Sequence, residues 1–304
     1  MNKISSWFDK KYRVSPAIKP FVPMLCCLPA LIFIVIFSLS PAILNLALSF
    51  TDYRSATTPF EFVGLQNYTE FFTLIGDEVK EVFSTTIKYT LLTIFPNNVI
   101  ALLAAFLTTR NLKGQNFFRA LYFMPMILGT VVVCFVWGII LDTGSGPMIE
   151  LLEGWGIETA LLGDPDTSLY WIVLVTVWGN FGYTMILYIA GLQGIDGTQY
   201  EAASIDGASG IKLFWYITLP LLKPTFVICF WIGISGSLGM ADYILLTTNG
   251  NYNTETIGFY ILRMVLYGSG TQGMNSAIII YNFIFVTTVM LVFKRLTRGK
   301  KEDD

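Results

Sequence analysis

One segment of the chain, residues 194–221, carries side chains whose types and spacing could act on another protein. Eight of its residues are candidates for such a contact: Glu201, Ala202, Ala203, Asp206, Gly207, Ile217, Leu219 and Pro220. Glu201 supplies a charge for a partly desolvated ion pair, and the two alanines after it allow a partner to approach closely. Gly207 can take the positive φ that a sharp corner needs. The segment is therefore predicted to dock on a partner protein.

The same segment is predicted to fold as two short helices. Thr198 can cap the first one, because Glu201 follows it by three residues as in a capping box. A second stretch runs from Lys212 to Tyr216 and is expected to stop before Pro220. The alternative is an amphipathic helix on the lipid surface, which predicts a polar face rich in Lys and Arg. Lys212 is the only basic residue between Gly194 and Leu219, so a compact pair of short helices is favoured.

Residues for catalysis and for metal binding are scarce. The chain has no histidine, which excludes Ser-His-Asp and Cys-His catalysis and histidine-bound zinc or haem. No G-x-x-x-x-G-K-[ST] loop is present to hold ATP phosphates, and no G-x-G-x-x-G opens a helix after a strand. The four cysteines lie inside apolar runs without a C-x-x-C pair. We therefore expect no catalytic residue, no bound metal or cofactor, and no enzyme activity in this chain itself.

The composition places the docking segment in a membrane protein. Of the 304 residues, 54% are hydrophobic and only 13% are charged, and the mean hydropathy is +0.61. There is too little polar surface here to cover a water-soluble monomer of this size. The formal net charge of -2 provides no basic field for nucleic acid, so nucleic acid is not expected as a partner.

Six long runs without a charged residue divide this apolar mass. They are 20–51, 89–109, 120–141, 167–195, 224–241 and 264–293. A helix needs about 20 apolar residues to cross about 30 Å of hydrocarbon, and all runs but the fifth are that long. The fifth becomes long enough if its helix continues past Asp242 to Leu246. Because the runs are continuous rather than alternating, the predicted fold is an all-α integral membrane protein with six transmembrane helices.

Positive charges predict the orientation of these helices. Fifteen of the 19 Lys and Arg residues lie in the N-terminal segment, the second and fourth connections and the C-terminal tail. Since cytoplasmic segments are enriched in Lys and Arg, both termini and the docking segment are predicted to be cytoplasmic. The predicted parts are a cytoplasmic N-terminal segment (1–20), a first transmembrane helix (21–50), an extracytoplasmic segment (51–84), a five-helix core (85–294) and a cytoplasmic tail (295–304).

The pattern in the docking segment resembles the EAA signature of permease subunits of binding-protein-dependent ABC importers. The resemblance covers nearly the whole chain, from about residue 20 to residue 295. Further segments that resemble the family are Phe62–Tyr68, Phe117–Pro125, Thr184–Leu187, Gly191–Gln193 and Thr248–Gly250. They are similar to permeases of sugar importers of the maltose and glycerol-phosphate type. The resemblance implies the type I importer fold with cytoplasmic coupling helices at residues 194–221.

The resemblance also implies a set of partners. In the family, the coupling helices dock in a cleft of a separate ATPase, where the glutamate at the position of Glu201 pairs with a basic residue. The implied assembly has a second permease subunit, two copies of the ATPase, an extracytoplasmic sugar-binding protein, a carbohydrate substrate and membrane lipid, in the cell membrane of a prokaryote. ATP is then bound by the partner subunit. The acidic segment 51–88 is expected to contact the binding protein.

Two predicted spans carry polar and aromatic side chains that could line a path for sugar. Asn180 and Tyr183 are three residues apart and are expected to project from one helix face. In maltose-type permeases several positions contact the sugar. The resemblance implies that these positions correspond here to Tyr183, Gly233, Gly236, Ser237 and Met240. Three of these positions depart from the polar and aromatic residues of the family, which predicts a differently shaped pocket. Close packing of helices through small residues explains Ser235 and Ser237 equally well.

Other polar residues of the spans have structural explanations. Asp242 lies near membrane depth or at its outer rim. Asn97 and Asn98 follow Pro96 and are expected to bond backbone groups that this proline leaves unpaired.

The predicted function is that of a permease subunit of an ABC importer, which moves a sugar or oligosaccharide by alternating access. One alternative is the same architecture for another solute, such as glycerol phosphate. A phosphate substrate would favour Lys or Arg within the spans, and the six runs hold none. A second alternative is a channel or secondary carrier that works without an ATPase, for which inverted repeats would be typical.

Overall fold

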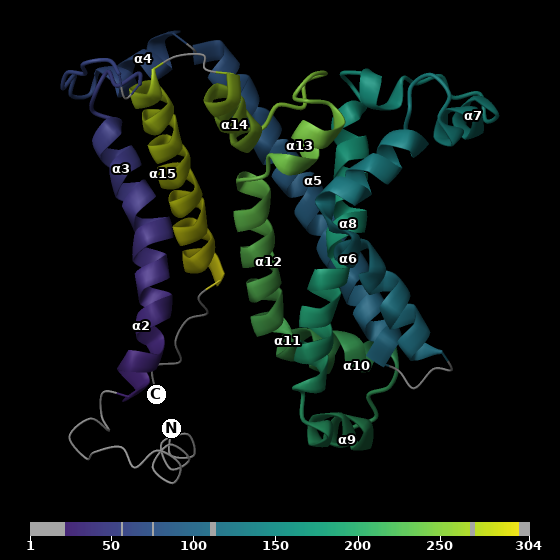
Figure 1. Cartoon of the computed structure of the whole chain (residues 1–304). Helices are drawn as coiled ribbons and strands as arrows, with labels where there is room; N and C mark the ends of the chain where they lie inside the picture. Colours follow the sequence, from purple (N-terminus) through teal and green to yellow (C-terminus); the bar gives the residue numbers. More distant parts are fainter. Residues whose placement is uncertain (1–21, 56, 75, 110–113, 268–270, 298–304) are drawn as a thin grey trace. The chain divides into compact units, whose positions relative to one another are not determined.

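The computed structural model of the chain describes residues 22–55, 57–74, 76–109, 114–267 and 271–297. Apart from one antiparallel bridge between Thr51 and Phe62, the regular structure of these residues is helical (Figure 1). The chain divides into two compact units, residues 1–69 with 271–280 and residues 70–270 with 281–304. The predicted segment 1–20 and most of the predicted tail 295–304 lie outside the described residues. The all-α class predicted from the sequence is confirmed.

The first unit contains a long apolar helix that corresponds to the first predicted run. Its segments are α2 (Val22–Ile34), the π-helical turn η2 (Val35–Leu39) and α3 (Ser40–Leu48). Together they are long and apolar enough to cross a membrane. In the same unit, Asn67 donates hydrogen bonds to the carbonyl oxygens of Ser49 and Thr51, at 2.8 Å each. These bonds fix the chain where it leaves α3.

The second unit holds most of the remaining helices. In chain order they are α5 (Gly76–Thr109), α6 (Gln115–Ile140), α7 (Pro147–Glu153), η3 (Leu161–Gly163), α8 (Ser168–Gln193), α9 (Gly197–Ile205), α10 (Ile211–Leu213), η4 (Phe214–Thr218), α11 (Leu219–Leu221), α12 (Lys223–Leu238), α13 (Asp242–Thr247) and α14 (Ile257–Tyr267). Helices α4 (Gln66–Leu74) and α15 (Gln272–Thr297) have residues in both units. At 1.5 Å per residue, α5 is about 51 Å long. Its charged first turns therefore extend beyond a hydrocarbon layer of about 30 Å.

Helix α8 is the central helix of the second unit and packs against α5 and α6. At Gly182 it approaches the backbone of α6 closely. A Cβ atom on Gly182 would lie 2.6 Å from the carbonyl oxygen of Tyr122 and 3.1 Å from the Cα of Phe123. Small residues allow such close approach of helices in membranes. Helix α6 itself bends at Gly129, whose φ of +74° is not helical.

The fifth predicted span differs from the structure, because α12 ends at Leu238 and the predicted continuation of its helix is wrong. The chain breaks over residues 239–241 and starts again as α13. The beginning of α14 packs into this break. The Thr256 hydroxyl donates to the Met240 carbonyl oxygen at 2.8 Å, and a Cβ on Gly258 would lie only 2.6 Å from the carbonyl oxygen of Gly239.

The sixth predicted run, 264–293, is also divided. Its first residues belong to α14, which ends at Tyr267, and α15 begins separately at Gln272. The described residues hold five helices that are long and apolar enough to span a membrane. The count reaches six if residues 211–221 and α12, which meet at 65°, form one bent span.

Candidate functional site

The predicted docking segment, residues 194–221, is called the elbow from here on. It follows α8 and contains two short helical stretches (Figure 1). Its first helix, α9, is capped by Asp196, whose Oδ1 accepts a hydrogen bond from the backbone N–H of Thr198 at 3.0 Å. The predicted cap, Thr198, is wrong because this residue lies inside α9 and Asp196 already occupies the capping position. Gly207 follows the end of α9 with a φ of +82°, which confirms the predicted corner.

The second stretch of the elbow is longer than predicted. Helices α10, η4 and α11 follow one another directly from Ile211 to Leu221, so the helix passes through Pro220 instead of stopping before it. A π-helical turn explains the difference. The N–H of Leu219 bonds the carbonyl oxygen of Phe214, five residues back. A proline ring would clash with the carbonyl four residues back in an α-helix, and the wider turn relieves that clash.

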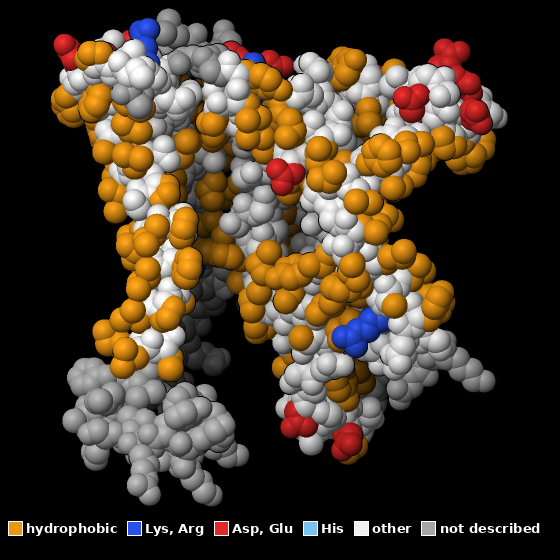
Figure 2. Space-filling view, viewed as in Figure 1, with side chains coloured by type: hydrophobic (Ala, Val, Ile, Leu, Met, Phe, Trp, Pro, Cys, Tyr) orange, Lys and Arg blue, Asp and Glu red, His pale blue; other side chains and the backbone are white. Residues whose placement is uncertain are grey.

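The surface of the elbow combines acidic and large apolar side chains. Glu201, Ala202 and Asp206 are exposed, while Ala203 is buried. The exposed apolar side chains are those of Ile205, Ile211, Trp215 and Tyr216. Ile205 is 87% exposed. Figure 2 shows acidic side chains close to apolar ones at the tip of the second unit, over α9. Exposed apolar surface of this kind is typical of a contact site for another protein or for a membrane.

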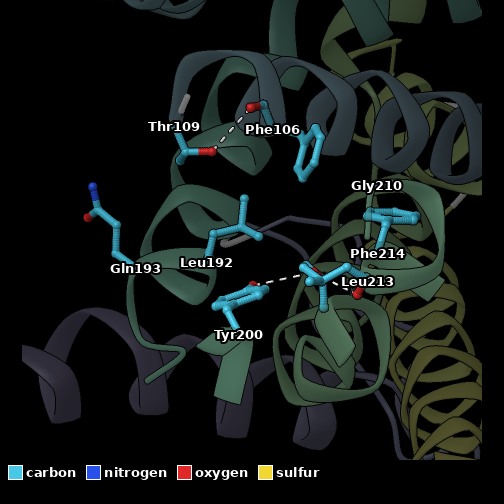
Figure 3. Close-up of a pocket in the computed structure, with 9 residues that line it drawn as sticks. Phe106, Thr109, Leu192, Gln193, Tyr200, Gly210, Leu213 and Phe214 are labelled. Atoms are coloured by element: carbon cyan, nitrogen blue, oxygen red, sulfur yellow. Dashed lines mark hydrogen bonds between the residues drawn. The ribbon is translucent and has the colours of Figure 1, made fainter. Parts of the chain in front are cut away.

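A cavity of about 390 Å³ lies between the elbow and the ends of α5 and α8 (Figure 3). Its lining residues are Phe106, Thr109, Leu192, Gln193, Tyr200, Gly210, Leu213, Phe214 and Thr218. Two contacts cross its edges. The hydroxyl oxygens of Tyr200 and Thr218 are 3.3 Å apart, and the rings of Phe106 and Phe214 meet edge to face with centroids 5.6 Å apart. The elbow therefore lies at the end of the unit where α5 and α8 stop.

A row of buried hydrogen bonds joins α5 to α8. The pairs are Tyr89 with Thr176 at 2.9 Å, Asn97 with Thr184 at 2.9 Å, and Tyr188 with Asn98 at 2.7 Å. The residue numbers rise together on the two helices, so α5 and α8 run parallel. Each bond satisfies polar groups that would be costly to leave unpaired in hydrocarbon. The row makes α5 and α8 one connected support for the elbow.

These bonds correct the prediction for the two asparagines beside Pro96. The Asn97 amide donates to α8 and not to the backbone of its own helix. Asn98 does donate to a backbone carbonyl, that of Ile94, at 2.9 Å. The carbonyl that lacks its usual helical donor is that of Leu92, four residues before the proline. The two amides therefore link helices more than they compensate for Pro96.

The candidate path residues on α8 lie in different surroundings. The Asn180 amide donates to the Tyr243 hydroxyl at 3.0 Å and to the Thr176 carbonyl oxygen at 2.8 Å, so it is engaged with α13 and its own helix. Tyr183 is 40% exposed. The Asn180 side chain is thus engaged in hydrogen bonds, whereas the Tyr183 ring is partly exposed.

The candidate path residues on and after α12 also differ among themselves. Ser237 is buried and Met240 is half-buried. A Cβ on Gly233 would lie 3.4 Å from Ile94 of α5, whereas a Cβ on Gly236 would meet nothing within 4 Å. Gly233 therefore serves helix packing, and Gly236 borders open space. Of the candidate path residues, Tyr183 is partly exposed and Gly236 borders open space.

Sequence reasoning missed Tyr200, Thr218 and Tyr243. Tyr200 stands directly before Glu201, but its partner Thr218 is 18 residues away, so no local spacing could reveal the pair. Tyr243 follows Asp242 in a run that was expected to be one straight helix. Among the described residues, no three His, Cys, Asp or Glu side chains gather in a group that could hold a metal ion.

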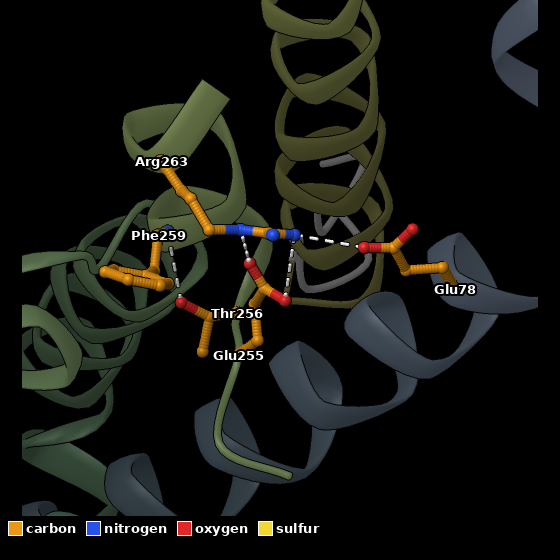
Figure 4. A network of polar contacts seen from close by, with 5 residues as sticks. All are labelled: Glu78, Glu255, Thr256, Phe259 and Arg263. Carbon is orange, nitrogen blue, oxygen red and sulfur yellow. Dashed lines mark hydrogen bonds and ion pairs between the residues drawn. The ribbon is translucent and has the colours of Figure 1, made fainter. Parts of the chain in front are cut away.

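A charged network lies where the loop before α14 meets the first turns of α5 (Figure 4). Arg263 Nε is 2.7 Å from Glu255 Oε1, and Arg263 Nη2 is 3.0 Å from Glu78 Oε1. Burial raises the pKa of Glu255, and this effect is larger than the lowering of the same pKa by the Arg263 cation. Burial lowers the pKa of Arg263, but the two carboxylates outweigh it and raise that pKa. Glu78, expected in the acidic segment for the binding protein, is engaged here with Arg263.

The sequence matches the family model of the binding-protein-dependent transport system inner membrane component over residues 97–301. The chain belongs to this family. The matched region includes the elbow and every candidate path residue, and the resemblance indicated by the EAA pattern is confirmed. The protein is therefore a membrane-embedded permease subunit of a binding-protein-dependent transport system.

Similar proteins support the same assignment. A probable ABC transporter permease protein of Pyrococcus horikoshii is 34% identical over 281 residues, which cover 90% of this permease and 91% of that protein. A probable starch degradation products transport system permease protein of Thermoanaerobacterium thermosulfurigenes is 30% identical, with 90% and 92% covered. A bacterial alginate ABC transporter, solved with an alginate pentasaccharide-bound periplasmic protein, has a chain with a TM-score of 0.79 at 23% identity, covering 94% and 97%. The predicted importer-permease fold is thus confirmed.

Proposed function

We propose that this permease is one of two membrane subunits of a type I ABC importer for a sugar or oligosaccharide. The curated relative named for starch degradation products supports a carbohydrate substrate. The family and the solved relative with a periplasmic protein support delivery of the substrate by an extracytoplasmic binding protein. Glycerol phosphate is a weaker candidate, because the six apolar runs contain no Lys or Arg that could pair with a phosphate.

We infer that the elbow is the docking site for a separate ATPase, of which the importer contains two copies. The observation that carries this inference is the exposed surface of the elbow, which includes Glu201 and the large apolar side chains of Ile205 and Trp215. Such a surface supplies both an ion pair and apolar area to a protein partner. In this proposal both termini and the elbow are cytoplasmic, residues 85–294 form the permease core, and the ATPase binds the ATP.

The proposed mechanism is alternating access. ATP binding closes the ATPase dimer, the elbows of the two permeases move with it, and the spans open outward to receive the sugar. Hydrolysis then restores the inward-facing state. The permease performs no chemical step, since its contribution is to convert a displacement at the elbow into access at a site within the spans. We place that site on the face of α8 and α12 that includes Tyr183 and Gly236, beside Ser237 and Met240.

Charge reversal at the elbow tests the docking proposal. Glu201→Lys should prevent co-purification of the ATPase and reduce sugar uptake by at least ten-fold, because an ion pair would become a like-charge contact. The matched control is Glu150→Lys, which reverses an exposed charge on α7, far from the elbow along the chain. The control should retain the ATPase. If Glu201→Lys also retained the ATPase and transported normally, the elbow would not be the docking site.

Truncation of Tyr183 tests the proposed path. Tyr183→Ala should raise the half-saturating sugar concentration for uptake while the ATPase stays bound, because the ring and its hydroxyl would no longer contact the sugar. Tyr170→Ala removes another exposed ring of α8 and serves as the control. Unchanged sugar kinetics in the Tyr183 variant would place the path elsewhere.

A further inference from the structure

The two halves of the elbow are joined at one polar contact. Tyr200, the residue before Glu201, extends from α9 toward the stretch 211–221 (Figure 3). Its hydroxyl oxygen lies 3.3 Å from Thr218 Oγ1. Among the described residues, no other side-chain hydrogen bond links α9 to this stretch.

Either hydroxyl can be the donor in this contact. The Thr218 hydroxyl also lies 3.4 Å from the carbonyl oxygen of Leu213, five residues back in the same stretch. Thr218 is only 2% exposed. The contact between the two halves of the elbow thus depends on the Tyr200 and Thr218 hydroxyls.

Thr218 is connected closely to the helix that carries the proposed path. Four residues later, Leu222 is fully buried, and the chain turns there by 65° into α12. The base of α12 rests on the backbone of α8, because a Cβ on Gly191 would overlap Thr225 and lie 3.0 Å from Leu222. A force applied to η4 therefore reaches α12 through packed atoms.

Beside Tyr200 there is space into which α9 could move. The cavity of about 390 Å³ separates Tyr200 from dense contact with the ends of α5 and α8. Because protein side chains do not fill this space, movement of α9 could be absorbed there if the hydroxyl contact were absent.

We propose that Tyr200 is the positioning residue that transmits displacement of α9 to α12 through its hydrogen bond to Thr218. The proposal rests on the proposed function of the elbow as the docking site for an ATPase. Tyr200 does not contact the sugar or ATP in this scheme. It determines how much of each ATPase movement reaches the spans.

The experiment measures sugar imported per ATP hydrolysed, with the whole importer reconstituted in lipid vesicles. Tyr200→Phe keeps the ring and removes the hydroxyl, and the ratio should fall by about three-fold, the change expected from one weak hydrogen bond. Thr218→Val should lower the ratio to a similar extent, and the double variant should be no worse than either single one. Thr218→Ser restores the hydroxyl and should retain the ratio.

Ser204→Ala is the matched control within the same helix. The Ser204 hydroxyl bonds the Tyr200 carbonyl oxygen inside α9 and does not reach η4, so its loss should leave the ratio unchanged. A normal ratio for Tyr200→Phe, or independent losses that multiply in the double variant, would overturn the proposal. If Tyr200→Phe does not assemble, the comparison of Thr218→Val with Thr218→Ser decides, since equal ratios for the two would also overturn it.

Failure of this inference is distinguishable from failure of the proposed function. The docking proposal fails if Glu201→Lys retains the ATPase. The inference about Tyr200 fails if Glu201→Lys releases the ATPase while Tyr200→Phe still imports a normal amount of sugar per ATP.

Discussion

Helices α6 and α8 lie in the same unit and are equally long, but they are built in opposite ways. Of the most apolar stretch of α8, 67% of the residues are buried, against 17% for α6. The most apolar stretch of α6 is nevertheless more apolar than that of α8. Helix α8 carries glycines and hydrogen-bonding side chains on its buried faces, whereas α6 exposes residues such as Ile127 and Phe135.

In a water-soluble protein the more apolar helix is usually the more buried one, and in this permease the order is reversed. Lipid is as apolar as leucine, so a lipid-facing helix gains nothing by hiding its large side chains. The helix in the centre is instead selected for close approach and for paired polar groups. In this permease, the less apolar span is therefore the structural centre.

The largest effect should come from a side chain added to a glycine of α8. Gly182→Leu would direct its side chain into the backbone of α6, so we expect loss of most folded protein, from a cost of about 3 kcal/mol or more. The measurement is the yield of monodisperse protein in detergent and its thermal midpoint. Gly138→Leu is the matched variant on α6, where the new Cβ would meet nothing within 4 Å. Equal losses for the two would refute the contrast.

A smaller effect should follow from removal of one hydroxyl between α5 and α8. Tyr188→Phe leaves the Asn98 oxygen without its donor and should cost about 0.6 to 1.7 kcal/mol of stability. Tyr170→Phe, on an exposed position of the same helix, should cost close to nothing. Thermal midpoints of the two purified variants check this prediction, which is wrong if their order is reversed.

The smallest effects concern two carboxylates, one at the end of α6 and one beside α5. Burial raises the pKa of Glu255, so the folded state binds this proton more tightly than the unfolded state does. Its contribution to stability should fall as the pH rises from the unfolded pKa of about 4.3 through the raised value. Glu255→Gln should remove that fall.

The exposed Asp142 should behave with the opposite sign. The N–H groups of Ser145 and Gly144 lower its pKa, so its contribution is present above the unfolded pKa of about 3.9 and is lost as the pH falls through the lowered value. Asp142→Asn should remove that loss. Thermal midpoints at a series of pH values test both variants, and a shared sign would contradict the two opposite environments.

The sequence predicted the helices well because charge-free length is what a bilayer demands. It predicted the elbow from the pattern around Glu201, and the corner at Gly207 from the freedom of glycine. It did not predict the break after Leu238, because the group that occupies this break, Thr256, lies 16 residues away from the carbonyl it bonds. Nor did it predict the contact made by Tyr200, since the pairing with Thr218 depends on how two short helices meet.

The two asparagines beside Pro96 illustrate the same limit. Their position in the sequence suggested a local role in their own helix. The structure uses Asn97 for a bond to α8, 87 residues further on. The sequence shows which polar groups need a hydrogen-bond partner, but the packing of the helices determines which partner each group has.

Because the chain bends by 65° at Leu222, a small rotation there moves the far end of the following helix by a larger distance. Helix α12 has 16 residues and is therefore about 24 Å long from its base to its tip. A tilt of about 5° at the bend would sweep the tip sideways by about 2 Å, which is more than the length of a C–O bond. A pivot at one end and Ser237 near the other make α12 a lever arm, in which a small angular input becomes a shift large enough to make or break a contact.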